Sequence, residues 1–184
     1  MCDPGDLLTL GKLAAVVNQA MPSSEVRRAF EALDADSRAC CLALLCEPCL
    51  HAVQQYFADP AKREYRDSVV GLHHVVDLDL PVRSLSEIRV AQGVPPASAL
   101  DSLLADYQEP MTAHQDNDLK ITDARAEYAY LAVYNLVRSC RNPDDRAAAW
   151  LVVRQALSAT GPEDPTHADL DGMLGRWMAA WPTD

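Results

Sequence analysis

Apolar residues recur at helical spacing along most of this 184-residue chain. Between Ser37 and about Ala58 they cover a helix nearly all round, which is typical of a helix enclosed by neighbours. Alanine and leucine are abundant, whereas isoleucine and phenylalanine occur only twice each, so residues that favour helix dominate every ambiguous window. We therefore predict an all-α fold: one irregular helical bundle of about eight helices over residues 1–184, with the segments 37–58 and 118–140 at its centre.

Prolines and capping residues set the expected boundaries in the first half of the chain. Helices are expected over residues 7–20 and, capped by Ser23 or Ser24, over the segment that follows. Pro48 has no backbone N–H to donate, so we expect a kink or a break beside it. Asp59-Pro60 resembles an N-cap followed by proline at the first helical position. It predicts a helix that continues to about Pro81, with an inward-facing stripe formed by Tyr65, Val69, Leu72 and Val76.

The second half of the chain is divided in the same way. A weak segment at 84–92 precedes the Pro95-Pro96 turn, and Pro110 is expected to end the next helix. A polar connection over residues 109–117 would then lead into the helix at 118–140. The sequence Asn142-Pro143-Asp144-Asp145 predicts the start of another helix, and Thr166-His167-Ala168-Asp169 resembles a capping box before the last one.

The charge balance and the lack of export signals narrow the classes of protein. A formal net charge of −11 argues against binding to nucleic acid or to anionic membranes, which both require clustered basic residues. The start of the chain lacks the basic and apolar order of a secretion signal, and the stretches without a charge, such as residues 13–24 and 48–58, are too short to span a bilayer. We expect a soluble, cytoplasmic protein whose six cysteines are reduced.

Negative charge gathers in two short windows. Residues 101–123 hold six acids against Lys120 alone, a net of −5, and residues 163–171 hold four acids and no base, a net of −4. If the windows adjoin in space, they would form one surface that attracts a cationic partner. The expected contact residues, with two apolar anchors among them, are Asp101, Asp106, Tyr107, Glu109, Met111, Asp116, Asp118, Asp123, Glu163, Asp164, Asp169 and Asp171.

These observations favour a binding protein over an enzyme. The chain lacks GxGxxG, Walker, GxSxG and HExxH patterns, so no catalytic residues, cofactor or metal are expected. We expect a non-enzymatic protein that binds and neutralises or regulates a basic protein partner, such as a toxin. A bacterial immunity protein or an anti-activator would act in this manner.

Two alternatives are also consistent with the sequence. In the first, the motif Cys46-Glu47-Pro48-Cys49 serves thiol redox chemistry or binds a metal, with His51, His73, His74 or Asp77 as further ligands. His73 and Asp77 are four residues apart and would share a face of the predicted helix. In the second, a helical enzyme assembles its site only in three dimensions, for example with His114 near Asp116.

Overall fold

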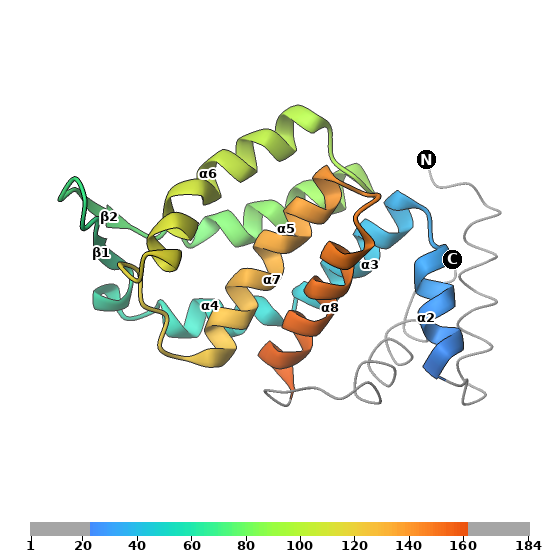
Figure 1. Cartoon of the computed structure of the whole chain (residues 1–184), viewed down its shortest axis with the longest axis horizontal. Coiled ribbons are helices and arrows are strands. Elements are labelled where there is room, and N and C mark those ends of the chain that lie inside the picture. Colours follow the sequence, from blue (N-terminus) through green and yellow to red (C-terminus); the bar gives the residue numbers. More distant parts are fainter. Residues whose placement is uncertain (1–22, 162–184) are drawn as a thin grey trace.

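The computed structural model describes residues 23–161, and most of them are helical (Figure 1). The prediction of an all-α fold is confirmed, although the described residues hold seven α-helices where about eight were expected for the whole chain. Two of the expected helices, at 7–20 and after Thr166, lie outside the described residues. The described elements are α2 (Ser23–Ala32), α3 (Ala35–Cys46), α4 (Cys49–Tyr56), the 3₁₀ turn η1 (Pro60–Lys62), β1 (Glu64–Arg66), β2 (His73–Val75), α5 (Asp79–Ala91), α6 (Ala97–Gln115), α7 (Ala124–Arg141) and α8 (Arg146–Thr160).

Helix α7 lies at the centre of the bundle, as predicted for residues 118–140. It packs against α3, α4, α5, α6 and α8, most extensively against α8 (Figure 1). Its large side chains are buried on several faces, including Tyr130, Val133, Leu136 and Val137. Full burial of one such side chain contributes about 1.5–3 kcal/mol, so this helix carries much of the stability of the core. The helix begins later than predicted because Asp123 caps it.

The predicted break at Pro48 is present. Helix α3 ends at Cys46 and α4 begins at Cys49, so two residues separate them. Leu42 of α3 and Val53 of α4 are both buried, and both helices pack against α7. The apolar segment is therefore interrupted without leaving the core.

The predicted helix from residue 60 to about residue 81 is wrong. Asp59 does act as a cap, and its carboxylate accepts a hydrogen bond from the backbone N–H of Ala61 at 3.0 Å. Only the short turn η1 follows, however, and the chain then forms an antiparallel hairpin in which Tyr65 of β1 lies opposite His74 of β2. Helix α5 comes after the hairpin and contains the weakly patterned segment 84–92 up to Ala91.

The predicted end of a helix at Pro110 is also wrong, because α6 continues through it to Gln115. A proline inside a helix costs roughly 3 kcal/mol, since it removes one backbone hydrogen bond and crowds the preceding turn. Tyr107 and Met111, four residues apart on either side of Pro110, are both buried against the core. Their packing offsets that cost, so the connection to α7 begins only at Asp116.

Helix α8 starts three residues later than its proline suggested. Asp145, rather than Asn142, is the N-cap, and its carboxylate accepts a hydrogen bond from the backbone N–H of Ala148 at 3.1 Å.

Among the described residues, no helix combines the length and apolar character needed to cross a membrane.

Candidate functional site

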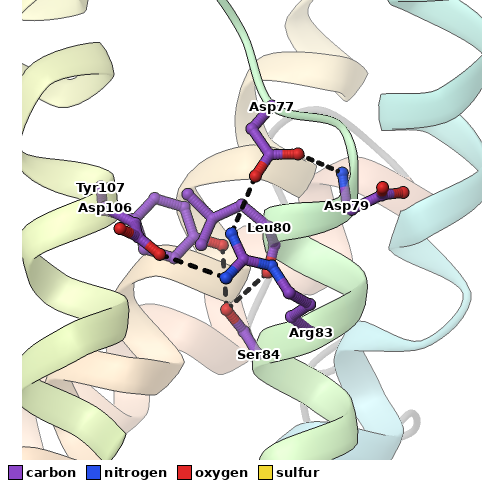
Figure 2. A network of polar contacts seen from close by, with 7 residues as sticks. All are labelled: Asp77, Asp79, Leu80, Arg83, Ser84, Asp106 and Tyr107. Atoms are coloured by element: carbon purple, nitrogen blue, oxygen red, sulfur yellow. Dashed lines mark hydrogen bonds and ion pairs between the residues drawn. The ribbon is translucent and has the colours of Figure 1, made fainter.

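Two of the six carboxylates in the window 101–123 are paired with arginines. Asp101 Oδ1 lies 2.7 Å from Arg141 Nε, and Asp106 Oδ2 lies 3.2 Å from Arg83 Nη1. Arg83 also contacts Asp77 at 2.8 Å, so one guanidinium bridges two carboxylates (Figure 2). A carboxylate that is already paired attracts a cationic partner less. Asp101 and Asp106 are therefore weaker candidates for contact with a partner than the sequence suggested.

The network around Arg83 has a structural role. Asp77 accepts hydrogen bonds from Arg83 and from the backbone N–H of Asp79, at the start of α5 (Figure 2). Arg83 also contacts Asp106 of α6, so the network joins the two helices. Asp77 and then Asp106 stabilise the charged guanidinium and raise the pKa of Arg83. Close to this ion pair, the Ser84 hydroxyl donates a hydrogen bond to the carbonyl oxygen of Leu80 at 2.8 Å (Figure 2).

The two predicted apolar anchors are corrected by the structure. Tyr107 is fully buried, and its ring packs against Tyr130 and Tyr134 with centroid distances of 5.7 and 5.4 Å. Met111 is only 6% exposed. Both side chains pack into the core from α6, so neither can serve as a surface anchor in this conformation.

The other four carboxylates of this window lie near the hairpin or on the connection to α7. Glu109 accepts a hydrogen bond from the Tyr65 hydroxyl, and its second oxygen lies 3.5 Å from His74 Nδ1. Asp118 Oδ2 accepts a hydrogen bond from the backbone N–H of Ser68 at 2.9 Å. These contacts join α6 and the following connection to a hairpin that lies far earlier in the chain.

Asp116 and Asp123 mark the two ends of the connection between α6 and α7. Asp116 is the C-cap residue of α6, and Asp123 caps α7 by accepting a hydrogen bond from the backbone N–H of Ala126 at 3.0 Å. Among the described residues, no lysine or arginine forms an ion pair with Asp116, Asp118 or Asp123. Their charges therefore remain available to a partner.

The second acidic window lies outside the described residues. Its predicted contact residues are Glu163, Asp164, Asp169 and Asp171. The structure thus places only one of the two windows.

The hairpin of residues 64–75 is the surface feature that the sequence analysis missed. Its tip, residues 67–72, is held by a dense set of backbone contacts. Asp67 Oδ1 accepts hydrogen bonds from the backbone N–H groups of Val69 and Val70 at 2.7 and 2.8 Å, and these bonds lower the pKa of Asp67. The backbone N–H of Asp67 donates to the carbonyl oxygen of Leu72 at 3.0 Å, and Gly71 supplies the positive φ of 72° that the turn requires.

The same hairpin carries most of the exposed large apolar side chains in the described part of the chain. Of seven such side chains, four belong to it: Val69 is 86% exposed, Val70 65%, Leu72 59% and Val75 59%. A group of exposed apolar side chains on one element is typical of an interaction surface. A sequence signal existed, because Asp67 and Gly71 bracket two valines and are frequent turn residues.

The base of the hairpin is fastened to the bundle by three side chains. The rings of Tyr65 and His74 stack with a centroid distance of 5.4 Å and an interplanar angle of 12°, and both side chains contact Glu109 of α6. Burial, followed by the hydrogen bond to Glu109, raises the pKa of Tyr65, so its hydroxyl remains a donor. The trio fixes the direction in which the hairpin projects from the bundle (Figure 1).

The cysteine motif has none of the features of a reactive thiol. Cys46 and Cys49 are both fully buried, and burial raises the pKa of Cys46 well above its ordinary range and that of Cys49 to about 12. The Cys49 Sγ lies 3.6 Å from the carbonyl oxygen of Leu45 and 3.7 Å from that of Ala156, and its single S–H can donate to either. An attacking thiolate requires a lowered pKa and access to solvent, so the structure gives the redox alternative no support.

The histidines considered as metal ligands are dispersed. His73 lies on β2 instead of a helix, so the helical face expected to join it to Asp77 does not exist. Within residues 23–161, no group of three or more potential ligands converges on one point. His114 contacts the carbonyl oxygen of Leu119 at 3.3 Å and a carboxylate oxygen of Glu127 at 3.3 Å, which places it in a helix-end network.

Described residues line two open grooves on the bundle. One of about 480 Å³ lies between α6 and α7, and Leu104, Tyr134 and Arg138 are among the residues that line it. The other, of about 560 Å³, lies beside α4 and includes His51 and Lys62. Neither groove includes Tyr65, His74 or Glu109, so the cluster of acid, histidine and tyrosine side chains described above is separate from both.

Comparison of the chain with protein-family models, with curated proteins and with solved structures found no match. The candidate site therefore rests on geometry and charge. It consists of the hairpin, residues 64–75, and the connection, residues 116–123, which we together call the hairpin end.

Proposed function

We propose that this chain is a non-enzymatic binding protein that occupies a basic protein partner and blocks or regulates it. The observation that carries the proposal is the position of Asp67, Asp116 and Asp118 at the hairpin end, where no described lysine or arginine forms an ion pair with them. A bacterial immunity protein or an anti-activator works in this way, and a cationic toxin such as a nuclease would suit this surface.

The charges at the hairpin end have the sign that this proposal requires. The connection carries Asp116, Asp118 and Asp123 against Lys120, a net of −2, and the hairpin carries two acids against Arg66, a net of −1. Arg66 is itself turned back, and its Nε donates to the carbonyl oxygen of Gly71 at 3.0 Å. A small cluster of fixed carboxylates steers a basic partner during encounter, and its effect falls as salt is added.

Lys62, which precedes the hairpin, is turned toward the bundle. Its ammonium group lies 4.5 Å from the centre of the Tyr56 ring. This contact holds one neighbouring cation against α4, so it opposes the acidic surface less than its position in the sequence suggests.

The test is the association rate with the partner, which is first isolated from the native cell with the full chain as bait. Asp116→Asn and Asp118→Asn are then combined. The amide oxygen introduced by Asp118→Asn can still accept the hydrogen bond from the backbone N–H of Ser68, so the fold is retained while two charges are lost. The matched control removes two exposed charges elsewhere, with Glu87→Gln and Asp144→Asn.

We expect the double variant at the hairpin end to associate several-fold more slowly at low salt, with a difference that shrinks as salt is added. The control pair should associate at close to the wild-type rate. Equal association rates for wild type and the hairpin-end variant at low salt would refute this placement.

A further inference from the structure

We infer that the hairpin tip, residues 67–72, is a convex apolar anchor that inserts into a concave apolar cleft of the partner, rimmed by lysine or arginine side chains. This inference rests on the proposed function and names the part of the surface that supplies affinity. Val69, Val70 and Leu72 are all more than half exposed, although polar residues would serve equally well at these positions of a solvated turn. Apolar area of this kind is stabilised only when a partner removes it from water.

Hydrogen bonds brace the tip in the chain without a partner. Asp67 bonds to two backbone N–H groups within the turn, and Asp118 holds the backbone of Ser68 from the neighbouring connection. The Tyr65 and His74 rings fasten the base to α6. A surface that is ordered in advance loses little conformational freedom on binding, so more of its contact energy appears as affinity.

Shape and charge define the kind of partner. The hairpin projects from one end of the bundle (Figure 1), so the surface that receives it must be concave. Asp67 and Asp118 lie beside the apolar side chains, and their charges match a rim of lysine or arginine. The same carboxylates repel anionic lipid, and the tip has no aromatic side chain of the kind that anchors proteins at membrane surfaces. A second copy of the chain is disfavoured by the net charge of −11 on each molecule.

The first experiment maps what the tip touches. A photoreactive benzoylphenylalanine replaces Val69 in the full chain, and in a control it replaces Val90, which is 79% exposed near the C-terminal end of α5. That end of α5 points away from the hairpin (Figure 1). After irradiation in the native cell, mass spectrometry identifies the cross-linked peptides. We expect position 69 to label one basic protein at an apolar cleft flanked by lysine or arginine, and position 90 not to label it.

The second experiment measures affinity with that protein after purification. Val69→Ser, Val70→Ser and Leu72→Ser are combined, and Val90→Ser is the control. We expect the triple variant to raise Kd about tenfold or more, mainly through faster dissociation, while urea unfolding remains close to wild type because the side chains are exposed in the free protein.

Several results would overturn the inference. They are cross-links from position 69 to a second copy of the chain, sedimentation of the wild type but not the triple variant with phosphatidylglycerol vesicles, no labelling specific to position 69, or an unchanged Kd for the triple variant.

The two proposals fail separately. An unchanged Kd together with slower association of the carboxylate variant refutes the anchor and leaves charge steering intact. A raised Kd together with salt-independent association refutes the proposed function, and with it the basic rim assigned to the cleft.

Discussion

Two buried tyrosines provide a matched test of how the hairpin end is held, because the same atom can be removed from each with opposite expected results. The Tyr56 hydroxyl accepts a hydrogen bond from the backbone N–H of Thr122 at 2.9 Å and donates to the carbonyl oxygen of Lys120 at 3.1 Å. It thereby ties the connection to α4. The Tyr130 hydroxyl is also buried, but it has no hydrogen-bond partner among the described residues.

The magnitudes follow from these contacts. Tyr56→Phe leaves a backbone donor and a backbone acceptor without their partner, which costs about 2 kcal/mol of unfolding free energy. With a urea m-value of about 2 kcal/mol/M, the midpoint should fall by roughly 1 M. Tyr130→Phe removes a hydroxyl that was desolvated without compensation, so we expect no loss and a gain of up to about 1 kcal/mol.

Urea unfolding followed by far-UV circular dichroism measures both variants under identical conditions. The pair is informative because the two substitutions change the same chemical group. A loss of more than about 1 kcal/mol for Tyr130→Phe, or an unchanged midpoint for Tyr56→Phe, would show that the hydrogen bonding assigned to these side chains is incorrect.

Three further predictions concern stability and the thiols. Leu136→Ala, at a fully buried site on the central helix, should cost about 3 kcal/mol in urea unfolding, and a loss below about 1 kcal/mol would contradict the central position of α7. Asp123→Ala should cost about 1 kcal/mol through loss of the α7 cap, and Asp123→Ser should restore most of it, whereas equal losses would argue against capping. Burial raises the pKa of Cys49 and Cys140 from 9.0 to about 12, so their contribution to stability is intact below pH 9 and is lost as pH rises through this range. Unfolding free energy should therefore be lower at pH 10 than at pH 8, and iodoacetamide should label both thiols slowly in the folded protein at pH 8; rapid labelling of Cys49 would restore the redox alternative.

The central helices could be predicted from the sequence because their signals are local and dense. The segment 37–58 is apolar nearly all round, and Pro48 interrupts it for a reason that lies in its own ring. The same rule was wrong at Pro110, where Tyr107 and Met111 are packed against distant parts of the chain and hold the helix together. Local breaking signals are reliable only where tertiary packing does not oppose them.

The hairpin end was hidden from sequence analysis for the same reason. The cap at Asp59 is real, but the hairpin that follows it is joined to Glu109, which contacts Tyr65 from 44 positions away. The window 101–123 was correctly found to be acidic, yet its charges are divided by partners elsewhere in the chain. Arg83 and Arg141 form ion pairs with Asp106 and Asp101. Three of the other carboxylates, Asp116, Asp118 and Asp123, lie on the connection between α6 and α7.

Hydrogen–deuterium exchange on the purified complex tests the location of the contact most directly. If the partner docks at the hairpin end, amides in residues 64–75 and 116–123 should exchange more slowly in the complex than in the free protein. The exchange rates of amides in the residues that line the groove between α6 and α7 should be the same in both. Protection confined to that groove or to α8, with none in the hairpin, would contradict the account.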